Sequence, residues 1–119
     1  MKFDDIPIFE PLAKLDEAAL DELPFGVVGL NGENLVEVYN ALEERLSGLS
    51  RERVLGRHFF FDVGPCMNNY LVAERFESEP VLDATISYVL TFRMRPTPVR
   101  LRLLQNPEAP RRWVLIDRS

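Results

Sequence analysis

The stretch TISYVLTFRMR, residues 85–95, carries the clearest periodic pattern in the chain. Its large apolar side chains alternate with mostly polar or charged ones, and successive side chains of an extended backbone point to opposite faces. The alternating apolar residues are Ile86, Tyr88, Leu90, Phe92 and Met94. This period of two predicts one long strand that is buried on a single face.

The rest of the chain predicts four more strands and several short helices. Asn31-Gly32 is typical of a tight turn that joins two strands as a hairpin, and Pro96 and Pro98 are expected to frame another turn. The expected strands span residues 25–30, 35–39, 85–95, 99–104 and 113–116. The expected helices span residues 16–23, pieces of 40–56, and 70–79, with a loop over 58–66.

Capping and breaking residues set the ends of these helices. Asp16 is expected to cap the first helix, which Pro24 ends. Gly48 and Gly56 are expected to interrupt the helical pattern that comes after the hairpin.

This order of elements predicts an α+β fold, in which a five-stranded antiparallel sheet carries short helices on one side, as in PAS domains. A pocket is expected between the sheet and its helices. We expect one structural domain in two parts, an N-terminal helical cap over residues 1–24 and a PAS core over residues 25–119.

The composition is that of one globular domain, with 119 residues, 46% hydrophobic and 28% charged. No apolar run approaches the roughly 20 residues that cross a bilayer, and residues 1–10 are acidic where a signal peptide would be basic. The single cysteine cannot form an internal disulfide. The cytoplasm is therefore the expected compartment, with no membrane partner.

The charge of the chain is unevenly distributed. The net charge of −5 argues against nucleic acid as a partner, because phosphate binding needs a basic face. Residues 1–44 carry eleven acids and two bases, whereas residues 92–119 carry seven arginines and two acids. These two parts either dock on one another or form separate solvated faces, and the sequence leaves both open.

The sequence lacks most signatures of an enzyme. It has no Gly-rich phosphate loop, no paired Cys/His metal spacing and a single histidine. A nucleophilic pair of Cys66 and His58 is conceivable, but eight residues of separation in a loop do not ensure contact. The alternative is that His58 is a satisfied loop residue, and we do not expect an enzyme.

Tyr39, Glu43 and Ser47 stand at four-residue intervals, which on a helical path places them on one side. Glu43 either points into the core among its apolar neighbours or lies on the surface beside Glu44. If it is buried without a basic partner, desolvation raises its pKa and favours the neutral acid. A neutral carboxylic acid and a tyrosine hydroxyl would then be two donors for a buried phenolate.

Together these pieces resemble the photoactive yellow proteins, which are small blue-light receptors with a PAS fold. The resemblance runs from Leu12 to Ile116 and depends on the order and spacing of its marks. In the first half these are Leu-Ala-Lys-Leu-Asp (12–16), Phe25-Gly26, Tyr39-Asn40-Ala41, Glu43, Ser47-Gly48 and Gly56. In the second half they are Phe59-Phe60, Asp62-Val63, Pro65-Cys66, Tyr88, Met94, Pro96-Thr97 and Trp113-Val114.

The resemblance implies a blue-light photoreceptor in which Cys66 carries 4-hydroxycinnamic acid (p-coumaric acid) as a thioester. A lone cysteine would not indicate this by itself, because most are buried and structural. Tyr39 and Glu43 match the two donors that hold the phenolate, and Ser47 matches a threonine that hydrogen-bonds the tyrosine. The residues that match the lining or lid of the chromophore pocket are Val28, Leu49, Phe59, Tyr88, Phe92 and Met94. The last of these also matches a residue that promotes thermal return to the dark state.

The resemblance also implies a series of events after light absorption. Isomerisation of the chromophore leads the phenolate to take the proton of Glu43, which leaves a buried carboxylate without a counter-charge. Such a charge costs several kcal/mol, and release of the N-terminal cap is the expected relief. We expect the acidic residues of the cap to rest against the arginine-bearing sheet until then. These residues are Asp4, Asp5, Asp16, Glu17, Asp21 and Glu22.

The chain departs from the family pattern near the chromophore. Leu49 stands where the best-known members have an arginine that covers the chromophore, so we expect an altered photocycle rate. Met67 comes directly after the cysteine in place of a small polar residue. The alternative function is a PAS-type ligand-sensing or protein-interaction module without a chromophore. In either case the sequence does not name the downstream signalling protein.

Overall fold

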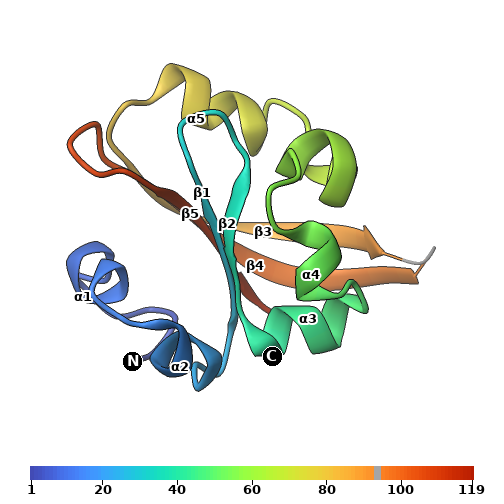
Figure 1. Ribbon diagram of the computed structural model, residues 1–119. Coiled ribbons are helices and arrows are strands. Elements are labelled where there is room, and N and C mark those ends of the chain that lie inside the picture. The colour runs from blue at the N-terminus through green and yellow to red at the C-terminus, as the bar shows by residue number, and fades with distance from the viewer. Residues whose placement is uncertain (93–94) are drawn as a thin grey trace.

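The core of the protein is a five-stranded antiparallel sheet with the strand order β2-β1-β5-β4-β3. The computed structural model describes residues 1–92 and 95–119, without the side chain of Phe92. The strands are β1 (Gly26–Leu30), β2 (Val36–Tyr39), β3 (Leu82–Phe92), β4 (Arg95–Gln105) and β5 (Arg112–Asp117). Figure 1 shows this sheet between two groups of helices. The predicted fold class is confirmed.

The strand predicted from residues 85–95 corresponds to the edge strand β3, which starts three residues earlier, at Leu82, and ends at Phe92. Arg95 already belongs to β4, and residues 93 and 94 lie outside the described residues. The turn predicted at Pro96 and Pro98 is wrong, because both prolines lie within β4, opposite Thr91 and Val89 of β3. The pairing of β4 with β5 begins only at Arg100, so this end of β4 has a single neighbouring strand. Because Pro96 and Pro98 are two residues apart, their backbone nitrogens, which carry no hydrogen, can both face the side of β4 that has no neighbouring strand.

Short helices fill the connections, and several of them begin or end as the sequence predicts. The helices are α1 (Phe9–Ala13), α2 (Glu17–Asp21), α3 (Ala41–Ser47), α4 (Arg51–Val54) and α5 (Ala73–Ser78). The Asp16 side chain caps α2 by accepting from the Ala19 amide at 2.9 Å, although this helix ends two residues before the predicted Leu23. Gly48 ends α3 in the left-handed conformation, with φ of 77°.

Residues 58–66 form helical turns rather than the predicted loop. Phe59–Val63 is a π-helical turn, η1, and Pro65–Met67 is a 3₁₀ turn, η2. The reason is packing, because the wide turn that the Gly64 amide closes on the Phe59 carbonyl lets Phe59, Phe60 and Val63 all be buried.

The sheet has an apolar core on each face. The helix-side core lies under α3, α4, η1 and α5, and the cap-side core lies under α1 and α2 (Figure 1). The helix-side core includes Val28, Tyr39, Phe59, Leu101, Val114 and Ile116. The cap-side core includes Phe3, Leu12, Leu20, Val27, Trp113 and Leu115. The alternation of side chains along each strand assigns neighbouring residues to opposite cores.

Arginines on the cap-side face of β4 hold the first residues of the chain. Arg100 contacts both carboxylate oxygens of Asp4 at 2.9 Å, and its guanidinium lies over the Phe3 ring. The buried Arg102 donates to the carbonyls of Phe3 and Asp5 at 2.9 and 2.8 Å. Of the two alternatives for the acidic and basic parts, docking is therefore the observed one.

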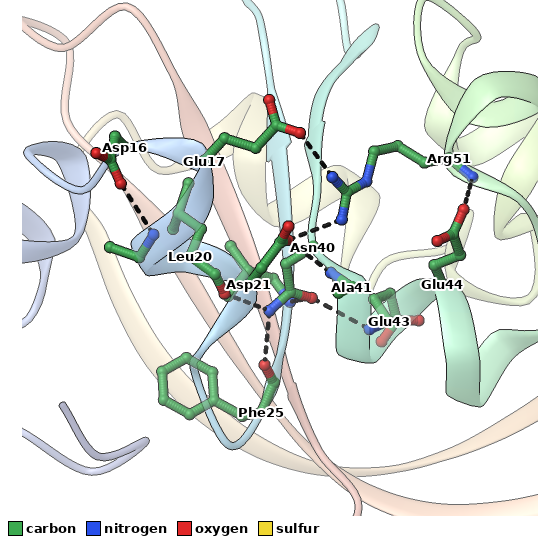
Figure 2. A network of polar contacts seen from close by, with 12 residues as sticks. Asp16, Glu17, Leu20, Asp21, Phe25, Asn40, Ala41, Glu43, Glu44 and Arg51 are labelled. Atoms are coloured by element: carbon green, nitrogen blue, oxygen red, sulfur yellow. Dashed lines mark hydrogen bonds and ion pairs between the residues drawn. The ribbon is translucent and has the colours of Figure 1, made fainter.

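A second attachment comes from outside the sheet. Arg51 of α4 pairs with Glu17 and Asp21 of α2, each at 2.7 Å, as Figure 2 shows. These two acids therefore contact the middle of the chain rather than the arginine-bearing sheet. The carboxylates of Asp5 and Asp16 accept from the Lys2 and Ala19 amides within the cap. Among the described ion pairs, the expected contact of a cap acid with a sheet arginine is therefore found for Asp4. Within the described residues, no helix combines the length and the apolar character needed to cross a membrane.

Replacement of Arg102 by methionine should loosen the start of the chain. The methionine keeps the apolar stem but leaves two carbonyls and Asp83 without their donor, so we expect a loss of about 1–3 kcal/mol in the free energy of unfolding. Urea denaturation measures this loss, and limited proteolysis reports exposure of residues 1–8. Arg53→Met, at an exposed position of α4, is the control. Equal stability of the two variants would contradict this role for Arg102.

Candidate functional site

Asn40 fixes the place where β2 passes into α3. Its Oδ1 accepts from the Glu43 amide at 3.1 Å, which caps α3, and from the Val27 amide at 2.9 Å. Its Nδ2 donates to the carbonyls of Leu20 and Phe25, both at 3.0 Å (Figure 2). One buried amide therefore joins α3, β1, the helix α2 at Leu20 and the segment after it at Phe25. From the sequence, Asn40 is part of the Tyr39-Asn40-Ala41 mark but has no assigned role, although an asparagine directly before a helical stretch is a capping signal.

Tyr39 and Ser47 meet on the helix-side face of the sheet. The Tyr39 hydroxyl lies 2.7 Å from Ser47 Oγ, and both residues are buried. Tyr39 is the last residue of β2 rather than part of the helix, so the two meet across the strand–helix junction and not along one helical path. Ser47 Oγ also accepts from the Leu49 amide at 3.2 Å. Either hydroxyl can donate in the Tyr39–Ser47 contact, and when Ser47 donates, the tyrosine proton is free to donate elsewhere.

Burial keeps the Tyr39 hydroxyl protonated. Desolvation raises the pKa of Tyr39 well above its usual value, and the nearby charge of Glu43 adds to the rise, against a smaller lowering by Ser47. The hydroxyl is therefore a hydrogen-bond donor over the whole physiological pH range.

Glu43 points into the core and is 1% exposed, which decides between the two interpretations of the sequence. The expectation that it has no basic partner is wrong. Arg118 Nη1 lies 2.6 Å from Glu43 Oε1, and Arg118 Nη2 lies 2.9 Å from Oε2. Burial raises the pKa of the Glu43 carboxyl, and the Arg118 guanidinium offsets part of that rise.

Gly26 of β1 makes room for this carboxylate. A Cβ at Gly26 would lie 2.1 Å from Glu43 Oε1 and 3.4 Å from Arg118 Nη1. A residue with a side chain cannot occupy this position unless the carboxylate moves, so the bare backbone of β1 forms one wall of the site.

Cys66 lies in η2, half-buried, and packs against the helix-side core that contains Tyr39. Its carbonyl accepts hydrogen bonds from the Tyr88 hydroxyl and from Asn69 Nδ2, the latter at 3.1 Å. Asn69 Nδ2 also lies 2.6 Å from the Tyr88 hydroxyl, so β3 and the segment after η2 together hold the backbone of the cysteine.

His58 is satisfied within its own turn rather than paired with the cysteine. Its Nδ1 accepts from the Phe61 amide at 3.2 Å, and its ring stacks on Phe61 with centroids 4.0 Å apart. Of the two alternatives for His58, a nucleophilic pair with Cys66 or a satisfied residue, the structure shows the satisfied residue.

The remaining predicted pocket residues lie in or against the same core where the structure describes them. Val28 and Phe59 are fully buried members of the helix-side core, and Leu49 and Tyr88 pack against it. Met94 and the side chain of Phe92 lie outside the described residues.

Known proteins match this chain closely in sequence and in structure. No family model matches it. A photoactive yellow protein from Rhodothalassium salexigens is 30% identical over 99% of this chain and 97% of its own length. The chain belongs to the photoactive yellow protein family.

Solved structures agree with this membership. The photoactive yellow protein domain of the sensor histidine kinase Ppr from Rhodospirillum centenum has a TM-score of 0.82 and 34% identity, with 92% of this chain and 98% of that chain covered. A PAS domain of an HTR-like protein from Haloarcula marismortui, at 22% identity and a TM-score of 0.64, shares the fold. Photoactive yellow proteins are photoreceptors and not enzymes, which confirms that expectation for this chain.

The close approach of Gly26 to Glu43 gives a test of the buried site. Gly26→Ala should push the Glu43 carboxylate away from Arg118 and lower the free energy of unfolding by about 1–3 kcal/mol, because the core has no space for the added carbon. Thermal and urea denaturation measure the loss. Gly32→Ala is the matched control, since nothing lies within 4 Å of its added carbon. Equal stability of the two variants would mean that the carboxylate is not confined as described.

Proposed function

We propose that this protein is a blue-light photoreceptor that carries 4-hydroxycinnamic acid as a thioester on Cys66. The observation that supports it most is the single cysteine of the chain on the same core as a buried tyrosine, serine and glutamate. Family membership gives the chemistry that these residues would serve.

The residues present fit such a group. A thioester needs one accessible thiol, and Cys66 is half-buried rather than sealed in the core. A phenolate needs donors, and the Tyr39 hydroxyl, with Ser47 behind it, has a proton to donate. Glu43 is buried beside them, and its ion pair with Arg118 is an addition to the site predicted from the sequence.

When bound, the 4-hydroxycinnamoyl group would supply absorption of blue light, isomerisation about its double bond and a phenolate oxygen. In this proposal Cys66 Sγ holds the thioester, while Tyr88 and Asn69 keep the cysteine backbone in place. Tyr39 donates to the phenolate oxygen, and Glu43 holds a proton there in the dark and gives it up after light absorption.

We assign the remaining pocket residues to the surroundings of the chromophore. Val28 and Phe59 would exclude water from it, and Leu49 would close it with an apolar lid. Tyr88 of β3 would border the chromophore as well. Phe92 and Met94 are assigned to the pocket from the sequence alone, with Met94 promoting the return to the dark state. The downstream signalling protein and a cytoplasmic location stay predictions.

We propose further that residues 1–24 act as a releasable cap on a core formed by residues 25–119. The cap is attached by ion pairs of Asp4 with Arg100 and of Glu17 and Asp21 with Arg51. These partly exposed pairs contribute little individually. The main cost of release therefore lies in the buried contacts of the cap, which are the hydrogen bonds from Arg102 and the apolar side chains of the cap-side core.

Loading of the chromophore tests the function directly. An activated thioester of 4-hydroxycinnamic acid should exchange with Cys66, so that a new S–C bond forms and the activating thiol leaves with the cysteine proton. We expect a yellow product, heavier by one 4-hydroxycinnamoyl group in mass spectrometry, that bleaches in blue light and recovers in the dark. Cys66→Ser should give no adduct. A parent protein that also fails to react would favour a PAS module without a chromophore.

Illumination of the loaded protein tests the cap. Limited proteolysis within residues 1–25 should be faster in blue light than in the dark, because the new charge on Glu43 should disturb the first turn of α3, which Asn40 caps, and Asn40 also holds α2 at Leu20. Mass spectrometry of the fragments gives the cleavage sites. Cleavage at equal rates in light and dark would rule out release of the cap.

A further inference from the structure

The Arg118 side chain reaches the deepest acid of the protein. It comes directly after β5, and in Figure 1 this end of the chain lies beside α3. Its guanidinium meets both oxygens of Glu43, at 2.6 and 2.9 Å, in the two-pronged geometry that makes arginine–carboxylate pairs strong. The side chains of Arg118 and Glu43 are 13% and 1% exposed, so water screens the pair little.

The elements next to Glu43 differ in the charge they bring to it. β2 contributes Tyr39, which stays neutral, and β1 contributes no charge, because Gly26 has no side chain. α2 contributes Asp21, which accepts from the Ala41 amide at the start of α3 and is already paired with Arg51. Among these described groups, Arg118 is the cation that contacts the carboxylate.

We propose that Arg118 is the counter-ion of the Glu43 carboxylate that proton donation leaves behind, and that it limits the electrostatic drive for release of residues 1–24. The inference rests on the proposed function, because it concerns the charge that the light reaction creates. The family resemblance implied a buried Glu43 carboxylate without a counter-charge after proton donation. In this proposal that carboxylate is instead already paired with Arg118.

Charge conservation supports this role. One proton is shared between Glu43 and the phenolate, so the two acids together carry one negative charge both before and after proton transfer. With Arg118 the site is neutral in both states. Because Arg118 touches the carboxylate directly, it stabilises the state after transfer more than the state before it. Arg118 therefore favours proton donation and leaves less free energy to unfold the cap.

The first test needs no chromophore. Infrared spectroscopy tracks ionisation of Glu43 with pH, and the band that Glu43→Gln removes assigns the signal. In Arg118→Gln the pH of half-ionisation should rise by about 1–3 units, because loss of an adjacent cation favours the neutral acid. The free energy of unfolding of Arg118→Gln should then fall more steeply with rising pH than that of the parent. The reason is that a carboxyl with a raised pKa in the folded state stabilises the fold only while it keeps its proton.

Two variants control this titration. Arg111→Gln removes the same charge from the same end of the chain, but its partner is the surface residue Glu37, so the titration of Glu43 should not move. Arg118→Lys keeps the charge without the two-pronged contact and should give a smaller shift. It also serves if Arg118→Gln does not fold. A titration that neither Arg118 variant changes would overturn the proposal.

The second test uses the loaded protein. The ratio of light to dark proteolysis within residues 1–25 should be larger in Arg118→Gln than in the parent. The increase should be up to about tenfold for each pH unit by which the same substitution raises the pKa of Glu43. In the Glu43→Gln background, Arg118→Gln should change the ratio no further. Equal ratios in the parent and Arg118→Gln would overturn the limit on cap release. A parent without an adduct would overturn the proposed function and the light-state role with it, whereas the infrared result would still decide whether the ion pair exists.

Discussion

Burial of one carboxylate constrains the arrangement of this protein more than any other interaction. Removal of a charged group from water costs several kcal/mol, whereas an ordinary hydrogen bond returns only about 1 kcal/mol. The site around Glu43 offsets that cost with a two-pronged contact from Arg118, and it fits only because Gly26 has no side chain. The strand β1, the helix α3 and the residue after β5 must therefore keep their relative positions for the carboxylate to remain buried.

Asn40 connects this buried acid to the opposite face of the sheet. Its side chain caps α3 at the Glu43 amide, and it also holds the carbonyl of Leu20, within the cap, and that of Phe25, directly after the cap. A shift at the first turn of α3 would therefore change hydrogen bonds on the cap as well. This is a physical route between the two cores that passes through one side chain rather than through the whole sheet.

Local signals in the sequence predicted most of the fold, and contacts between distant residues account for what was missed. Asp16 caps its helix, and Gly48 ends α3, because each effect depends on a few neighbouring residues. The buried group of Tyr39, Glu43 and Ser47 could be anticipated in part. Their four-residue spacing suggested one shared side, and Tyr39 and Ser47 do meet. Arg118 could not be anticipated, because 75 residues separate it from Glu43 and no periodicity relates them. The turn expected at Pro96 failed for a similar reason, since only the pairing of strands shows that one side of β4 is free there.

The uneven charge of the chain acquires a specific meaning in this structure. Alternation along β4 places Arg100 and Arg102 on the face that the first residues cover, while Arg118 projects to the opposite face and meets Glu43. The basic end of the chain therefore serves both cores, with one set of arginines to attach the cap and one arginine to neutralise the buried acid. In the proposed light-driven switch the two roles would oppose each other, because a neutralised acid would supply less free energy to release residues 1–24 from the sheet. The balance between them, rather than the presence of the acid alone, would determine how far the protein opens.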